Sequence, residues 1–390
     1  MPDDSKANEV NHVYILGAGF SRPMGGPLFT DLFTKLVPYG FLTYTETTSP
    51  NILAEIVDVD STAYLAKIVR HFPMYFQDFK EHANNNPEHF LELCDCALNG
   101  KEVWFTTCLI KRFFPWTVEG FTSLSEERRN SLIERIINCC KIRLALETNT
   151  FTQNVPNNND RWSPYTRWFE KLGRRDTLIS LNYDLLVETV AEKKQRPFPG
   201  RNFKIMDDSA RVEDLLEQNE REPNLPLLCK LHGSVDWFEK DEVAFVKRYA
   251  VDDYFYGYPP LLGTPGTGKV GLSEGSLKRV WQTALERLRD AHVISIVGYS
   301  LPETDNDFRI KLLDSIRENN GNLKAINIVL GQPTPHSQRA RAILEQATRL
   351  YSPVGERPTV NLLPIYAQDY LPYYRPSKKT EIHDHAFPRC

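Results

Sequence analysis

The sequence lacks several features that would place it in a familiar class of protein. No apolar run approaches the roughly 18 residues that a helix needs to span a bilayer, which excludes a transmembrane helix. The N-terminus, MPDDSKANEV, lacks the basic-then-apolar order of a secretory signal. A net charge of −4 gives no indication of direct nucleic-acid binding. We therefore expect a cytoplasmic protein without membrane contact.

Paired cysteines are also missing. The seven cysteines include no C-x-x-C pair, and their number is odd. A zinc ribbon needs two such pairs, and a disulfide framework needs an even number of cysteines at regular spacings. We expect no zinc, and we interpret most of these cysteines as small buried apolar residues in a reducing compartment.

What is present is an alternation of strand-like and helix-like patterns. Four short apolar segments are each followed by a helical pattern: 12–17 before 28–37, 177–181 before 185–192, 293–297 before 307–316, and 325–330 before 337–347. Such alternation predicts an α/β fold with a Rossmann-like, mostly parallel sheet that is covered on both faces. A further helical stripe around Trp281, over 277–288, is interpreted as core.

A largely α-helical inserted module interrupts this alternation after the first strand. The pattern predicts helices over 63–72, 90–98 and 132–146, with a capping box of Ser123 and Glu126 before the last one and a loop over 154–160. The 390 residues exceed the usual size of one domain. We predict a Rossmann domain over 12–45 and 171–372, a helical insertion over 46–170, and a flexible or docking tail over 373–390.

Loops at the carboxyl ends of parallel strands are where such sheets bind ligands. The first loop contains Gly17, Ala18, Gly19, Phe20 and Ser21, and its glycines allow backbone amides to approach a pyrophosphate. A tight turn that needs positive φ values is the competing interpretation.

Three later loops carry polar residues in corresponding places. Asn182 and Asp184 follow the second strand, where they can orient a ribose and a water or cap the next helix. His232 ends another apolar run and suits proton transfer near neutral pH, although a lone histidine is more often structural. Gly298 and Ser300 follow the strand over 293–297 and form a small-residue loop suited to a nucleotide.

Taken in this order, the four loops resemble the sirtuin-like family, in particular its bacterial defence branch of NAD⁺ hydrolases. The resemblance covers about residues 12–371. It rests on G-A-G-x-S at Gly17 with the later Gly25 and Pro27, N-x-D at Asn182, H-G at His232, and G-x-S at Gly298. It implies that Asn182 and His232 are catalytic. It also implies that eight residues bind NAD⁺: Gly17, Ala18, Gly19, Phe20, Ser21, Asp184, Gly298 and Ser300.

The sequence also departs from the deacylases of this family. They hold zinc with two C-x-x-C pairs, which are missing here, and they carry Asp-Phe-Arg where Leu28-Phe29-Thr30 stands. Lysine deacylation is therefore disfavoured. A second nucleotide motif, G-x-x-x-x-G-K over 263–269, ends in Val270 where a P-loop needs Ser or Thr to bind Mg²⁺, so an NTPase is also disfavoured.

The expected activity is NAD⁺ glycohydrolysis with NAD as substrate, which yields nicotinamide and ADP-ribose, or a cyclic form if a ribose hydroxyl attacks. Such an enzyme is toxic to its host when unregulated, so the resemblance implies an effector of abortive infection that a trigger releases. The roughly 20 residues beyond the catalytic region are too few for a sensing domain. We expect a homo-oligomer or a separate HerA-type ATPase partner. A non-catalytic subunit that senses NAD or ADP-ribose is the alternative, while a nuclease subunit or scaffold lacks a carboxylate cluster.

Overall fold

A six-stranded parallel sheet forms the centre of the molecule. The computed structural model describes residues 10–28, 31–34, 62–81, 86–100, 103–114, 124–157, 159–200, 209–247, 259–264, 267–319, 321–351 and 357–372; the predicted tail over 373–390 lies outside them. The strand order is β10-β9-β8-β1-β2-β4. Counted in chain order, this is the 3-2-1-4-5-6 arrangement of the Rossmann fold. The predicted α/β class with a parallel sheet is confirmed. The strands are β1 (His12–Leu16), β2 (Thr177–Ser180), β4 (Leu227–Lys230), β8 (Val293–Val297), β9 (Ala325–Val329) and β10 (Thr359–Leu363).

Helices cover both faces of this sheet because successive strand residues point to opposite sides. In β1, Tyr14 and Leu16 join one buried cluster, while Val13 and Ile15 join another. The first cluster is closed by α7 (Trp162–Lys171), α8 (Leu186–Lys193) and α15 (Ala367–Tyr370), and the second by α9 (Val212–Arg221), α12 (Lys278–Arg289), α13 (Asn306–Arg317) and α14 (Pro335–Tyr351).

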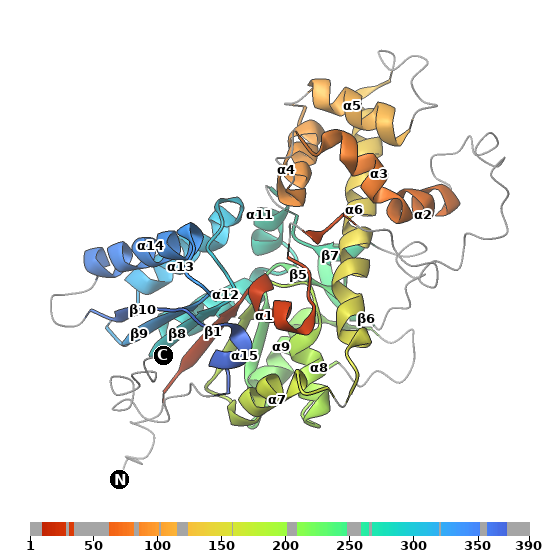
Figure 1. Cartoon of the computed structure of the whole chain (residues 1–390). Helices are drawn as coiled ribbons and strands as arrows, with labels where there is room; N and C mark the ends of the chain where they lie inside the picture. The colour runs from red at the N-terminus through yellow and green to blue at the C-terminus, as the bar shows by residue number, and fades with distance from the viewer. Residues whose placement is uncertain are drawn as a thin grey trace, which may run out of the picture.

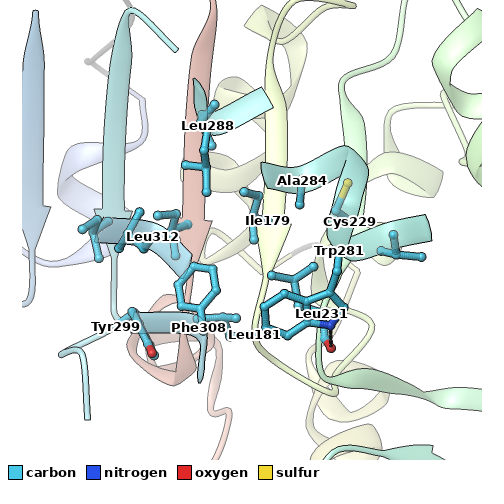
Figure 2. Close-up of a cluster of buried hydrophobic side chains, with 14 of the residues drawn as sticks. Ile179, Leu181, Cys229, Leu231, Trp281, Ala284, Leu288, Tyr299, Phe308 and Leu312 are labelled. Atoms are coloured by element: carbon cyan, nitrogen blue, oxygen red, sulfur yellow. Dashed lines mark hydrogen bonds between the residues drawn. The ribbon is translucent and has the colours of Figure 1, made fainter. Parts of the chain in front are cut away.

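The apolar residues predicted over 277–288 lie on helix α12 and pack against the parallel sheet. Trp281 and Ala284 pack near Ile179 and Cys229 on the second face, and the indole N–H of Trp281 donates to the carbonyl of Leu231 at 3.0 Å (Figure 2). The expectation that Trp281 belongs to the core is confirmed, since it is 2% exposed. This contact also fixes the chain immediately before the candidate residue His232.

The inserted module is a group of helices beside the carboxyl ends of the strands (Figure 1), and its buried core also includes Tyr183, Val235 and Leu262 from outside the module. It comprises α2 (Thr62–Arg70), α3 (Phe72–Phe76), α4 (Pro87–Leu98), α5 (Val103–Phe113) and α6 (Glu126–Asn154). The predicted helices are present, but the predicted cap of α6 is wrong. Ser125 accepts the amide of Arg128 at 3.2 Å, whereas Ser123 lies outside the described residues. Across the described ranges, no helix has the length and apolar composition of a bilayer span.

The cysteines of the described ranges are free thiols. Cys94, Cys139 and Cys140 are buried in the module, and Cys229 is buried on strand β4 of the parallel sheet. Burial raises the pKa of Cys139 and of Cys229 to about 12, because the thiolate would be deprived of water. These four behave as small apolar residues, as expected; Cys96 is half-buried and Cys108 is exposed.

A second, antiparallel sheet was not predicted from the sequence. It has the order β3-β6-β5-β7 and is built from β3 (Ser209–Arg211), β5 (Gly233–Lys240), β6 (Val243–Lys247) and β7 (Pro260–Leu262). Its strand β5 begins directly after His232. The G-x-x-x-x-G-K stretch starts where β7 ends and runs into α11 (Thr267–Glu274), so it does not follow a strand of the parallel sheet.

Candidate active site

The loops after four neighbouring strands meet at one edge of the parallel sheet. The strands β8, β1, β2 and β4 are consecutive in the sheet and run in the same direction. The amide of Gly17 donates to Val297 at 3.0 Å, and the amide of Leu231 donates to Ser180 at 3.0 Å. The structure therefore brings the four segments that sequence analysis selected to the same end of the sheet.

Close backbone packing explains the glycines of the first loop. A Cβ atom on Gly17 would lie 2.6 Å from the carbonyl oxygen of Gly298, and one on Gly19 would lie 2.7 Å from the Cα of Gly298. Gly298 itself has a φ of +71°. The loop after β1 thus packs against the loop after β8, and no side chain fits between them.

The helix that follows this loop differs from the predicted one. The helix α1 (Ala18–Ser21) begins directly after Gly17 and continues as the 3-10 turn η2 (Arg22–Met24). The prediction of a helix over 28–37 is wrong in its described part, because residues 31–34 form a turn in which Phe33 has a φ of +62°. The glycine loop is therefore a short helical turn at the carboxyl end of β1.

The side chains of α1 point in two directions. Phe20 is 1% exposed and packs edge-on against Tyr165 and Trp168. Ser21 points to the loop after β2, where its hydroxyl donates to Asp184 Oδ2 at 2.7 Å. The amide of Phe20 donates to the Gly17 carbonyl at 2.8 Å and its carbonyl accepts the Tyr165 hydroxyl at 2.7 Å, so Phe20 is a packing residue of the loop, while Ser21 belongs to a polar network.

Asn182 is the centre of that network. Its Nδ2 donates to the carbonyl of Gly17 at 2.9 Å and to Ser21 Oγ at 3.2 Å. Its own amide donates to Ser180 Oγ at 3.2 Å, which fixes the turn after β2. The side chain is half-buried, so the amide joins two loops and still borders solvent.

Asp184 both caps α8 and closes the network. Its Oδ1 accepts the amide of Leu186 at 2.9 Å, while Oδ2 accepts Ser21. Burial raises the pKa of this carboxyl; Lys230, Ser21 and the Leu186 amide act in the opposite direction without cancelling the loss of water. Asp184 can therefore cap the helix α8 and belong to the polar network of the candidate site at the same time.

Lys230 is a structural member of the site that sequence analysis missed. It is 2% exposed, and its ammonium donates to the Asp184 carbonyl at 2.6 Å, to Ser234 Oγ at 2.7 Å and to Glu188 Oε1 at 3.0 Å. A lysine at the end of the apolar strand β4 is the only signal that the sequence offers. Lys230 ties the turn after β2 to the start of β5.

His232 lies behind this network and is 3% exposed. Its Nδ1 is 3.1 Å from the carbonyl of Leu181, the residue before Asn182. Its Nε2 is 3.3 Å from Asp305 Oδ1, an ion-pair contact without the alignment of a hydrogen bond. Asp305 ends the 3-10 turn η9 (Glu303–Asp305) and accepts the hydroxyl of Tyr299 at 2.8 Å. Nothing local in the sequence marks Asp305, because its partner His232 lies much earlier in the chain, between β4 and β5.

The accessible part of the site is made of backbone and small side chains. Ala18, Gly19, Asn182, Gly298 and Ser300 are half-buried, while the other candidates are buried. The amides of Gly19 and Gly298 already donate to backbone carbonyls, at 2.9 and 2.8 Å. The groups that this surface can offer to an extended polar ligand are the start of α1 at Ala18, the carboxamide oxygen of Asn182 and the hydroxyl of Ser300. Within the described ranges, no group of three His, Cys, Asp or Glu side chains is placed to hold a metal ion.

A protein-family model matches the part of the chain that carries most of the candidate site residues. Residues 176–351 match the model of the SIR2-like domain, which supports a sirtuin-like assignment for the stretch that carries Asn182, Asp184, His232 and Gly298. The glycine loop lies before the matched stretch. No curated protein matches the chain.

A solved structure of Sir2Tm bound to a propionylated peptide also aligns with the chain. The two share 12% identity over 94% of this chain and 92% of that one, with a TM-score of 0.33. This superposition is too loose to add to the strand order, which is what defines the Rossmann-like fold.

Proposed function

We propose that this chain is an NAD⁺ glycohydrolase that cleaves the nicotinamide–ribose bond. The observation that carries the proposal is the Asn182 carboxamide, which joins the loops after β1 and β2 and borders solvent where these loops meet. The similarity of residues 176–351 to a SIR2-like domain supports NAD⁺ as the ligand. Ala18, half-buried at the start of α1, places a helix N-terminus of the kind that suits a pyrophosphate next to this carboxamide.

The chemistry asks little of a nucleophile, because nicotinamide is a good leaving group. The C1′–N bond breaks with its electron pair on nicotinamide, and a water oxygen forms the new bond to C1′. In the proposed roles Gly17–Ser21, Gly298 and Ser300 hold the pyrophosphate, Asp184 and Asn182 fix the ribose, and Asn182 positions the water. The water's proton passes to His232. Positioning and charge stabilisation supply most of the rate.

Two substitutions test this assignment. Asn182→Ala and His232→Ala are each expected to reduce nicotinamide release by at least about 100-fold, since proton transfer and positioning each contribute that much. The measurement is nicotinamide release by the purified chain with NAD⁺ and, in parallel, with candidate activators. His336→Ala, on an exposed histidine of α14, is the matched control that should leave turnover unchanged. Unaltered NAD⁺ loss with both site variants would refute the assignment.

We further propose that the chain acts as an effector of abortive infection, held inactive until a partner or assembly releases it. A homo-oligomer or a HerA-type ATPase is the partner that the family resemblance favours. Co-expression with such an ATPase should yield a complex and should lower cellular NAD⁺ after phage challenge. A monomer that is fully active alone would contradict this regulation.

A second candidate is a subunit that binds NAD or ADP-ribose without turnover. The internal engagement of both His232 ring nitrogens favours it, because no ring nitrogen faces solvent in this conformation. Calorimetry separates the two functions. Binding of NAD⁺ without nicotinamide release under every activating condition would establish the sensor.

A further inference from the structure

His232 has both of its ring nitrogens committed inside the protein. The carbonyl of Leu181 can only accept, so Nδ1, at 3.1 Å, carries a proton and donates. The other nitrogen, Nε2, faces a carboxylate oxygen of Asp305 at 3.3 Å. Without a proton on Nε2 or on the carboxyl, two lone pairs would face each other in a buried place, which is unfavourable. One further proton therefore belongs to this pair.

Tyr299 holds Asp305 in this position. Its hydroxyl donates to Asp305 Oδ2 at 2.8 Å, and burial together with the neighbouring carboxylate raises the pKa of Tyr299 well above its ordinary value, so the hydroxyl stays a donor. With Nδ1 bound to Leu181 and Nε2 against Asp305, neither ring nitrogen of His232 is open to a substrate in this conformation.

We propose that Asp305 is a latch on His232, which withholds the imidazole from the substrate until the turn Glu303–Asp305 withdraws. The inference rests on the proposed hydrolase function and names how that site is regulated. Leu301, which leads into the turn, has a φ of +55°, a left-handed conformation that leucine rarely adopts. The segment that leads into the latch therefore carries backbone strain.

The helical module holds the latch closed. The hydroxyl of Thr304, beside Asp305, donates to Glu88 Oε2 at 2.7 Å. Glu88 is 7% exposed and lies in the first turn of α4, a helix fixed by the Asn86 cap and by the module's buried core. A partner that shifts α4 would pull on Thr304 and separate Asp305 from His232. The inserted module thereby gains a direct connection to the proposed base.

Weakening the tether should activate the chain without its partner. Thr304→Val and Glu88→Ala each remove the bond, and each should raise basal nicotinamide release about tenfold, the effect of losing one hydrogen bond to a carboxyl group. The double variant Glu88→Ala/Thr304→Val should exceed neither single one, because both break the same contact. Glu88→Gln keeps an acceptor oxygen and should stay near wild type.

Glu303→Gln is the matched control within the same turn. Its side chain is 73% exposed and pairs with Arg339, so turnover should not change. Thermal unfolding of every variant confirms that the chains are folded. Turnover of the two tether variants equal to or below that of a measurably active wild type would overturn the latch.

The contact between His232 and Asp305 gives a readout that does not depend on activity. Nitrogen-15 NMR of labelled histidine should show the Nε2 resonance of His232 displaced between the wild type and the isosteric Asp305→Asn, with Nδ1 little changed. Identical Nε2 resonances would end the proposal. If no chain hydrolyses NAD⁺ with any activator, the hydrolase function fails, and the NMR result alone decides whether Asp305 engages Nε2.

Discussion

Individual glycines show how tightly the loops at the sheet edge are built. Gly298 and Gly25 both have positive φ values, +71° and +97°, but their surroundings differ. A Cβ on Gly298 would lie 2.1 Å from the amide nitrogen of Phe20, whereas a Cβ on Gly25 would meet nothing within 4 Å. Comparison of the two glycines therefore distinguishes the effect of a positive φ, which both share, from the effect of close packing, which only Gly298 has.

Substitution of these two glycines should give unequal losses of stability. Gly25→Ala is expected to lower the free energy of unfolding by about 1 kcal/mol, the cost of a left-handed alanine. Gly298→Ala should lower it by about 3 kcal/mol or more, because the loop after β1 must also move. Urea denaturation measures both. Equal losses would mean that the contact between the two loops does not constrain the site.

The buried carboxyl of Asp184 should make stability depend on pH. Its pKa is raised in the folded chain, so the folded state binds its proton more tightly than the unfolded state does. The contribution of Asp184 to stability is complete below its unfolded pKa, near 4, and declines as pH rises through the raised folded pKa. Asp184→Asn removes this decline.

The stability of Asp184→Asn relative to wild type should consequently improve as pH rises from about 4 to neutral. Chemical denaturation of both chains across that range gives the difference. The change in slope, rather than the offset, is the quantity of interest, because the amide also alters the hydrogen bond from Ser21. A difference that falls with pH would contradict the raised pKa.

Among the elements, the longest helix depends on a cap that sequence reasoning misplaced. Ser125, whose hydroxyl oxygen accepts the Arg128 amide, begins α6. Ser125→Ala should cost about 1 kcal/mol in the free energy of unfolding, while Ser125→Asn, which also accepts at this position, should cost much less. Thermal unfolding of the two variants distinguishes them. Equal effects would show that the cap contributes little.

Four of the parallel strands, β1, β2, β8 and β9, were predictable because each is short, wholly buried and mostly apolar, whereas β10 is partly exposed. The strands β1, β2, β8 and β9 agree with the predicted segments to within a residue. The second sheet escaped prediction because β3 and β7 have three residues each, too few to show alternation. The helix α1 escaped for the same reason: four residues show no 3.6-residue period.

The residues of the candidate site also differ in how far the sequence could indicate them. The proposed site residues that directly follow strands, such as Asn182 and His232, could be selected because parallel sheets bind ligands at the carboxyl ends of their strands. Lys230 and Asp305 act through contacts between distant segments, which no local pattern reports. The sequence could therefore indicate candidate residues at the strand ends, but not the residues that hold them in place.

At the scale of the whole molecule, the inserted module and the Rossmann domain share a core. Tyr183, between Asn182 and Asp184, belongs to the module's buried cluster together with Val235 and Leu262 of the second sheet. The hydroxyl of Tyr183 also donates to the carbonyl of Gly263 at 2.7 Å. The loop after β2 thus contacts both the helical module and the segment after β7 through Tyr183. A displacement of the module is therefore expected to move Asn182, the residue before Tyr183.

The position of the insertion has a consequence for biosynthesis. The strand β1 lies between β2 and β8 in the sheet, yet the chain leaves β1 at Leu16 and returns to its first neighbour only at Thr177. At roughly 5–20 residues per second, a ribosome needs on the order of 10–30 s to deliver that partner. Throughout this interval HVYIL has no strand to pair with, so the nascent polypeptide offers holdase chaperones an early binding site.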